Sequence, residues 1–117
     1  MRAVTQASFG GPEELKIDLI DKPIAAAGQV LVKVIATSVN RPDVIQRQGN
    51  YPPPPGDSEV LGLEIAGEVA EVGAGISRWK VGDKVMGLVG GGGYAEFATA
   101  WEHHLRSEEH TSELQSH

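Results

Sequence analysis

The stretch VLGLEIAGEVAEVG, residues 60–73, carries the strongest fold signal in the sequence. Small and β-branched apolar residues dominate it from Glu64 onward and Gly73 ends it, which is typical of a β-strand. Glu64 interrupts the apolar run LGLEIAGEV, so its carboxylate either faces outward on the strand or is buried beside a partner. The periodicity leaves both alternatives open.

Neighbouring segments repeat the strand pattern. In QVLVKVIATSV, residues 29–39, the valines alternate with Leu31, Lys33 and Ile35, which gives one fully apolar face. A short helix is expected at about residues 42–48, because Pro42 begins it and Gly49 follows its end. The other candidate strands, separated by Gly and Pro, are residues 1–5, 14–20, 64–73, 81–89 and 94–100. This pattern predicts a mainly β domain with a short helix, either a barrel or a sandwich.

Composition limits the class of protein. The 117 residues suit one domain, and 40% apolar with 22% charged residues is ordinary for a soluble chain. No segment approaches the roughly 18 to 20 apolar residues of a membrane span, and the first residues lack a signal-peptide core, so we expect a cytoplasmic protein without a membrane partner. A net charge of -6 argues against nucleic acid as a partner. The absence of cysteine excludes disulfides, thiolate zinc ligands and thiol nucleophiles.

The tail RSEEHTSELQSH, residues 106–117, differs from everything before it. Its only apolar side chain is Leu114, so burial cannot offset the entropy cost of ordering, and we expect disorder. RSEEHTSELQS is also similar to the in-frame translation of a common sequencing-adapter oligonucleotide. We therefore expect a domain at residues 1–105 and an artefactual tail at residues 106–117.

The sequence motifs give little support for a phosphate site or a metal site. The run Gly90–Gly93 is not followed by the Lys and Ser or Thr of a phosphate loop, and we expect a flexible hairpin connection. No G-x-G-x-x-G turn opens a helix after a strand, so the element that holds a dinucleotide is absent. His103 and His104 would point apart on a strand, and no Cys, Asp or third His lies at ligand spacing.

The segment NRPDVIQRQGNYPPPPG, residues 40–56, is the remaining candidate for a functional site. Asn40 lies near the cap position of the short helix, so a capping role and a role in a site are both open. The run Pro52–Pro55 suits a polyproline II ligand or a rigid loop, and its place between a helix and patterned strands favours the loop. Tyr51 is then held by a stiff neighbour, either as a pointed hydroxyl or as a packed aromatic.

These motifs resemble a known family. GLEIAGEV, residues 62–69, is similar to the G-H-E-x-x-G-x-V signature of the medium-chain dehydrogenase/reductase superfamily, with leucine in place of the histidine of the zinc enzymes. Residues 40–56, followed by VLGLEIAGEVAEVG, RWKVGDKV and GGGGYAEF, resemble the zinc-independent NADPH:quinone oxidoreductases of the zeta-crystallin type. The resemblance covers residues 1–105. It implies a partial GroES-like barrel, the alcohol dehydrogenase N-terminal domain, with the Rossmann domain missing.

The resemblance also implies which chemistry fits. The cysteine position of the zinc enzymes falls within residues 38–40 and their histidine position is Leu63, so we expect no zinc. Without a Lewis acid, alcohol oxidation is a poor fit. Hydride transfer from NADPH to a quinone or an activated enone requires no metal.

By the same resemblance, residues 40–56 line the cleft between the barrel and the cofactor domain. Asn40 matches an asparagine near the nicotinamide, and Tyr51 matches a substrate-pocket tyrosine whose hydroxyl would hydrogen-bond a quinone oxygen. We expect these two to be catalytic, and Asn40, with Arg41 and Gln46 as weaker candidates, to bind the cofactor. Glu64 is the retained acid of the signature and is expected to support the site rather than donate a proton.

The primary expectation is therefore the N-terminal part of an NADPH-dependent quinone oxidoreductase, inactive as a fragment, whose full-length relatives are homo-oligomers. An enoyl reductase that acts on an activated thioester is the alternative within the superfamily. A non-catalytic GroES-like binding module is the alternative from another class, because a fold alone does not fix a function.

Overall fold

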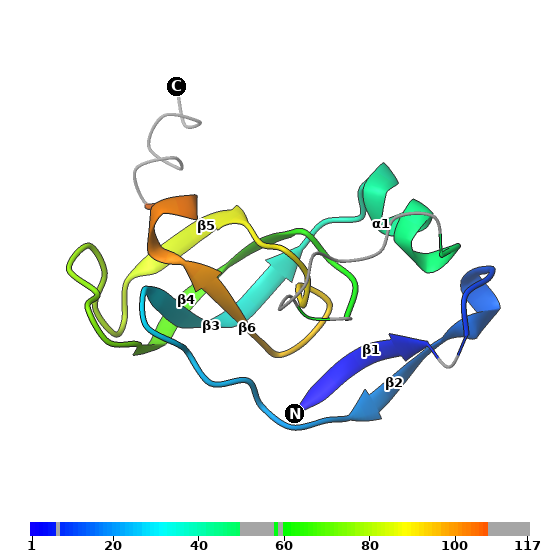
Figure 1. The fold of residues 1–117 in the computed structure, drawn as a ribbon, viewed down its shortest axis with the longest axis horizontal. Helices are drawn as coiled ribbons and strands as arrows, with labels where there is room; N and C mark the ends of the chain where they lie inside the picture. Colours follow the sequence, from blue (N-terminus) through cyan, green and yellow to red (C-terminus); the bar gives the residue numbers. More distant parts are fainter. Residues whose placement is uncertain (7, 50–57, 59, 108–117) are drawn as a thin grey trace.

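The computed structural model describes residues 1–6, 8–49, 58 and 60–107. Its main element is a five-stranded sheet in the order β6-β3-β4-β5-β7, beside a two-stranded sheet of β1 and β2 (Figure 1). Every strand pair in these ranges is antiparallel. The strands are β1 (Arg2–Gln6), β2 (Leu15–Leu19), β3 (Gln29–Thr37), β4 (Glu64–Val72), β5 (Lys84–Leu88), β6 (Phe97–Trp101) and β7 (Leu105–Ser107).

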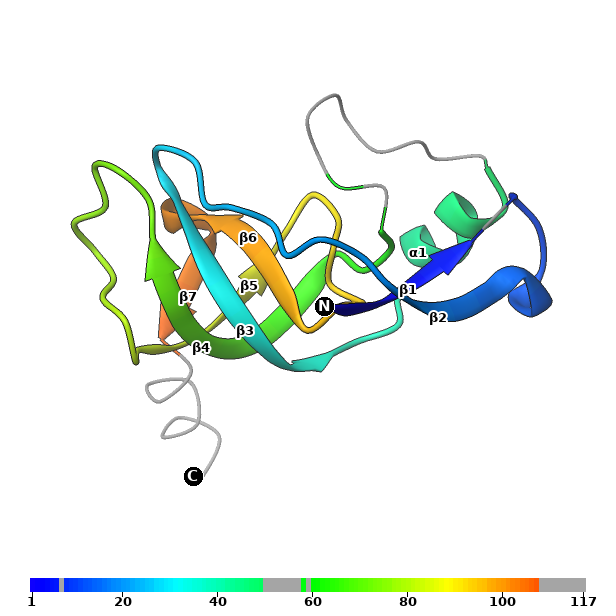
Figure 2. The same cartoon turned by 90° about the horizontal axis from the view of Figure 1, so that it is seen from below.

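The helical elements are short. Helix α1 spans Arg41–Arg47, and the 3-10 helices η1 and η2 span Pro12–Glu14 and Glu102–His104. In both views, α1 lies at the end of the molecule that holds β1 and β2, away from the loop that joins β4 and β5 (Figures 1 and 2). Among the described residues, no helix is long and apolar enough to cross a lipid bilayer.

The core forms where β3 and β4 pair. Val30 and Val32 on β3 are fully buried, and Ile65 and Val69 on β4 are almost so. Burial thus alternates along β4 as expected, whereas on β3 the intervening Leu31 is fully buried as well. The core cluster consists of Val30, Val32, Ile65, Val69, Val85, Val89, Ala98, Ala100 and Leu105.

Gly67, the second glycine of the signature, lies in β4 directly against the backbone of β3. It pairs with Val34, next to a register shift between Val34 and Ala36. A Cβ atom on Gly67 would lie 2.1 Å from the backbone oxygen of Lys33, which no real side chain tolerates. The glycine is therefore required by the strand pairing.

Strand β1 links the two sheets without closing them. Ala3 forms an isolated bridge with Ala95, and the Val4 N–H donates to the Tyr94 carbonyl at 2.8 Å. The N-terminal ammonium of Met1 donates to the Ile20 carbonyl at 2.6 Å, at the far end of β2. The expectation of a mainly β, partial GroES-like barrel with one short helix is confirmed.

Three details differ from the expectations. Strand β7 pairs Arg106 with Met86 and Ser107 with Val85, so ordered pairing extends two residues beyond the expected boundary at residue 105. The expectation that disorder begins at Arg106 is wrong for these two residues, because β5 supplies them with a hydrogen-bonding edge. Residues 108–117 lie outside the described ranges.

The histidine pair and the glycine run also differ. His103 and His104 lie in η2 rather than on a strand. Within the glycine run, Gly91, Gly92 and Gly93 are buried, and the N–H groups of Gly92 and Gly93 donate to the carbonyls of Val60 and Gly62 at 2.7 and 2.9 Å. The run is therefore packed against residues 60–62 and is not a free hairpin connection.

Candidate functional site

Asn40 stands at the N-cap of α1, as its position in the sequence allows. It forms a capping box with Asp43, and its backbone N–H donates to Asp43 Oδ2 at 2.9 Å. Such a box satisfies N–H groups that have no partner within the helix. The half-buried Asn40 is therefore a capping residue by geometry, and its side-chain amide is held at the end of β3.

The Asn40 side chain begins a chain of hydrogen bonds that reaches Glu64. Asn40 Nδ2 donates to Ser38 Oγ at 3.0 Å, and Ser38 Oγ donates to Glu64 Oε1 at 2.6 Å. Glu64 is exposed at the start of β4, which answers the question its place in an apolar run raised. Its carboxylate faces outward and also has a partner, the Ser38 hydroxyl.

The other expected residues of this segment lie in different surroundings. Arg41 is exposed in the first turn of α1. Gln46 is only 5% exposed, and its Nε2 atom is buried without a hydrogen-bond partner in the part of the chain that the structure describes. Arg41 is thus accessible to a ligand and Gln46 is not. Tyr51 and Pro52–Pro55 lie outside the described residues.

Tyr94 was not expected to belong to the site, yet it contacts the same helix. Its hydroxyl donates to Asp43 Oδ2 at 2.7 Å, and it lies 3.5 Å from the Ser38 carbonyl. Burial, followed by the hydrogen bond to the Asp43 carboxylate, raises the pKa of the Tyr94 hydroxyl far above its ordinary value. The structure thus brings Asn40 and Glu64 together, with Ser38, Asp43 and Tyr94 in addition.

An apolar groove of about 620 Å³ begins at Glu64. Its lining side chains are Glu64, Met86, Leu88, Val89, His104 and Arg106. Leu88 faces Glu64 across the β4–β5 pair and is 61% exposed. A flat apolar ring could therefore lie on this surface with polar atoms beside it, an arrangement common in small-molecule sites.

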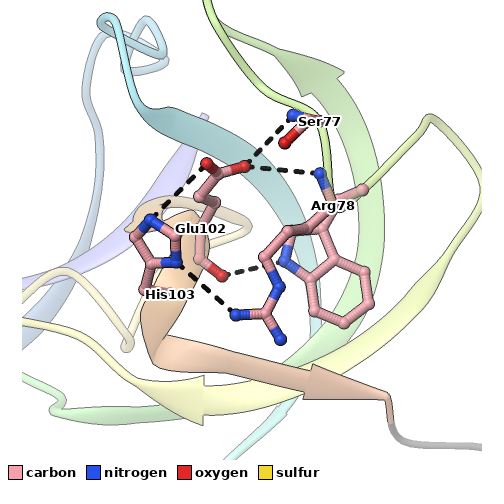
Figure 3. Close-up of polar contacts among 5 residues, drawn as sticks. Ser77, Arg78, Glu102 and His103 are labelled. Carbon is pink, nitrogen blue, oxygen red and sulfur yellow. Dashed lines mark hydrogen bonds and ion pairs between the residues drawn. The ribbon is translucent and has the colours of Figure 1, made fainter.

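A second polar cluster lies around the buried Glu102, at the β4–β5 loop (Figure 3). Glu102 Oε2 accepts the backbone N–H groups of Ser77 and Arg78 at 3.3 and 3.5 Å, and the Glu102 carbonyl accepts Trp79 Nε1 at 2.9 Å. His103 Nε2 lies 3.7 Å from Glu102 Oε1, and its Nδ1 lies 3.5 Å from Arg78 Nη1. Every bond of Glu102 to residues 77–79 ties the loop to η2, so this cluster anchors the loop.

A metal site needs several donor side chains close together. Within the described ranges, no group of three or more His, Asp or Glu side chains is arranged to hold a metal ion. Leu63, at the histidine position of the signature, offers no ligand atom.

Residues 26–107 match the alcohol dehydrogenase GroES-like domain. The chain is a member of the alcohol dehydrogenase GroES-like family. The hydrogen-bonded residues Ser38, Asn40 and Glu64 all lie within the matched range.

Three proteins similar to this GroES-like chain are two quinone oxidoreductases and an enoyl reductase. The quinone oxidoreductase of Lama guanicoe is 42% identical over 105 residues, 88% of this chain and 32% of that protein. The crystal structure of Escherichia coli quinone oxidoreductase complexed with NADPH has a TM-score of 0.82 at 28% identity and covers 92% of this chain and 33% of that one. The CurK enoyl reductase has a TM-score of 0.77 at 25% identity, with 92% and 35% covered.

The GroES-like chain thus spans about a third of the length of the relatives that it matches. It corresponds to the N-terminal domain of quinone oxidoreductases of the medium-chain dehydrogenase/reductase superfamily, which confirms the resemblance drawn from the motifs. Sequence reasoning missed Ser38, Asp43 and Tyr94. The signal that was available for Tyr94 is the glycine run before it, which allows the close approach to residues 60–62.

Proposed function

We propose that this chain is the GroES-like part of an NADPH-dependent quinone oxidoreductase that transfers hydride to a quinone or an activated enone. The observation that carries the proposal is the 42% identity to a quinone oxidoreductase over 105 residues. The site geometry supports it, because the hydrogen-bonded chain from Asn40 to Glu64 ends at an apolar groove. Quinone rings are flat and largely apolar, with oxygen atoms at their edges, and suit such a surface.

The proposed roles differ in how directly each residue contacts the ligand. Asn40 orients the ligand, because its amide is held by Ser38, and Tyr51 donates a hydrogen bond to the substrate oxygen as negative charge develops there. Glu64 acts through Ser38, whose hydroxyl it fixes. Arg41 is exposed and free to approach the cofactor, whereas the buried Gln46 is the weakest candidate for a direct contact.

The described residues fit only one edge of a nicotinamide cofactor. Asn40 and Arg41 at the start of α1 are the groups that would contact it, and the sequence has no glycine fingerprint to hold the phosphates. When bound, NADPH supplies the hydride. The chain contributes placement and hydrogen bonds, and it offers neither the cysteine nor the signature histidine that zinc would require.

Three further properties belong to the proposal. The 117-residue chain alone is inactive, because half of a cofactor site does not position the reacting atoms. A cytoplasmic location of the complete protein is part of the same proposal. The complete protein also forms homo-oligomers, as the family resemblance implies.

A chimera tests this function. Residues 1–105 replace the matching part of E. coli quinone oxidoreductase, and NADPH oxidation is followed with a quinone, an enone and an activated thioester. We expect no NADPH binding or turnover by the 117-residue chain and quinone or enone reduction by the chimera. A folded chimera that binds NADPH and reduces none of the three would refute the proposal. Preference for the thioester would indicate an enoyl reductase instead.

A further inference from the structure

The backbone and the ring of Tyr94 are both fixed by contacts with other parts of the chain. Its backbone N–H donates to the Leu61 carbonyl at 2.9 Å, and its carbonyl accepts the Val4 N–H at 2.8 Å. The ring packs against Gly62, which has a φ of +107°, and a Cβ atom there would lie 2.7 Å from Tyr94 Cδ1. With both backbone groups bonded and the ring confined, the hydroxyl has little freedom to point elsewhere.

The partner of that hydroxyl is a buried carboxylate with few other donors. Asp43 is 2% exposed, and its Oδ2 atom accepts both the Tyr94 hydroxyl at 2.7 Å and the Asn40 N–H at 2.9 Å. Within the described ranges, Asp43 Oδ1 has no hydrogen-bond partner. A buried carboxylate requires its hydrogen bonds, because each lost donor leaves part of the cost of removing it from water uncompensated.

The two hydrogen bonds at Asp43 Oδ2 join separate parts of the chain. Tyr94 lies 51 residues from Asp43, just before β6, whereas Asn40 caps the helix that contains Asp43. The Asn40 side chain in turn donates to Ser38, which donates to Glu64. The hydrogen-bonded residues Tyr94, Asp43, Asn40, Ser38 and Glu64 therefore form one continuous network.

We propose that Tyr94 is a positioning residue of this site: acting through Asp43, its hydroxyl fixes the N-terminus of α1 and with it the Asn40 amide that donates to Ser38. The purpose of this positioning, to orient Asn40 toward a ligand, rests on the proposed function, whereas the positioning itself rests on the geometry alone. A space-filling role would need only the ring, which phenylalanine keeps. Removal of the hydroxyl separates the two roles.

Nuclear magnetic resonance of the 117-residue chain tests the proposal without cofactor or substrate. The variants are Tyr94→Phe and Asp43→Asn, and the readouts are hydrogen exchange of the Asn40 backbone N–H and the chemical shifts of its side-chain amide. We expect exchange at Asn40 to become roughly tenfold faster in both variants, on the scale of one hydrogen bond to a charged group. The side-chain amide signals should move toward those of a free asparagine. Exchange at Val32 in the core should change far less.

Trp79→Phe is the matched control, because it also removes one hydrogen bond from a half-buried aromatic, at the Glu102 carbonyl. It should leave the Asn40 signals and exchange unchanged. The proposal is wrong if Asn40 is unaffected in Tyr94→Phe, if Val32 exchange rises by the same factor as Asn40, or if the control changes Asn40 equally. A folded chimera that binds NADPH and reduces none of the three substrates would refute the proposed function and leave this result as it stands.

Discussion

Ser38 and Glu64 are joined by a 2.6 Å hydrogen bond between the end of β3 and the start of β4. These are the two chain segments in which, by the family signature, the zinc enzymes carry a cysteine and a histidine. A hydroxyl and a carboxylate connect the segments in this protein, and Asn40 extends the connection to α1. The local fold is thus cross-linked by hydrogen bonds between side chains, one of which, Glu64, also lines the groove.

Zinc binding is expected to be absent. The sequence has no cysteine, and Leu63 stands at the histidine position of the signature. Purified protein incubated with zinc and passed through a desalting column should contain far less than one zinc per chain by elemental analysis. A value near one per chain would show that other side chains form a site.

Tyr51→Phe should lower quinone turnover of the chimera by roughly tenfold or more, because the lost hydrogen bond serves the developing oxyanion on the scale of one to three kcal/mol. Quinone reduction by the variant is measured at saturating NADPH. Ser8→Ala is a suitable control, since Ser8 is exposed and, within the described ranges, its hydroxyl donates to the half-buried Glu14 at 3.0 Å. Unaltered turnover of the Tyr51 variant would assign Tyr51 to packing.

Two truncations test how much the C-terminal residues contribute to the stability of the fold. Removal of residues 108–117 should leave the Tm unchanged within error, because the segment contains one leucine and few groups worth burying. Removal of residues 106–117 should lower the Tm by a few degrees, since it also deletes the pairs of Arg106 and Ser107 with β5. Calorimetry of the three chains makes the comparison. A large loss from the shorter truncation would show that the tail docks.

Stability should fall in alkaline solution because of Tyr94. The raised pKa of its hydroxyl means that the fold favours the protonated form, so this contribution is complete below the ordinary pKa of 10.0 and is lost as the pH rises above it. Urea unfolding from about pH 9 to about pH 11 should show a decline in wild type that is weaker in Tyr94→Phe. Tyr51→Phe should keep the full decline, and equal slopes in all three proteins would contradict this account.

Sequence periodicity predicted the strands well where one face is covered. Strands β3 and β4 lie within two residues of their expected bounds, because alternating valines and isoleucines must share a core. Strand β7 was missed, since three residues that pair with a distant edge carry no periodic signal.

The candidate site was predictable only in part. Asn40 and Glu64 emerge from a cap position and an interrupted apolar run, both of which are local patterns. The bond between Tyr94 and Asp43 joins residues 51 positions apart and depends on how β1 and the glycine run are packed. The glycine run before Tyr94 indicates a close approach of the chain there, but no local pattern identifies Asp43 as the partner of its hydroxyl, which only the three-dimensional structure shows.

The contact of the Met1 ammonium with the Ile20 carbonyl has a practical consequence for expression of this protein. An affinity tag fused ahead of Met1 would turn the charged amine into an ordinary amide and force extra chain past the end of β2. Exposed apolar side chains on that strand, Ile17 and Leu19, would then lie beside a loosened edge and favour aggregation. Purification handles should therefore be attached after residue 117 or cleaved to leave Met1 as the first residue.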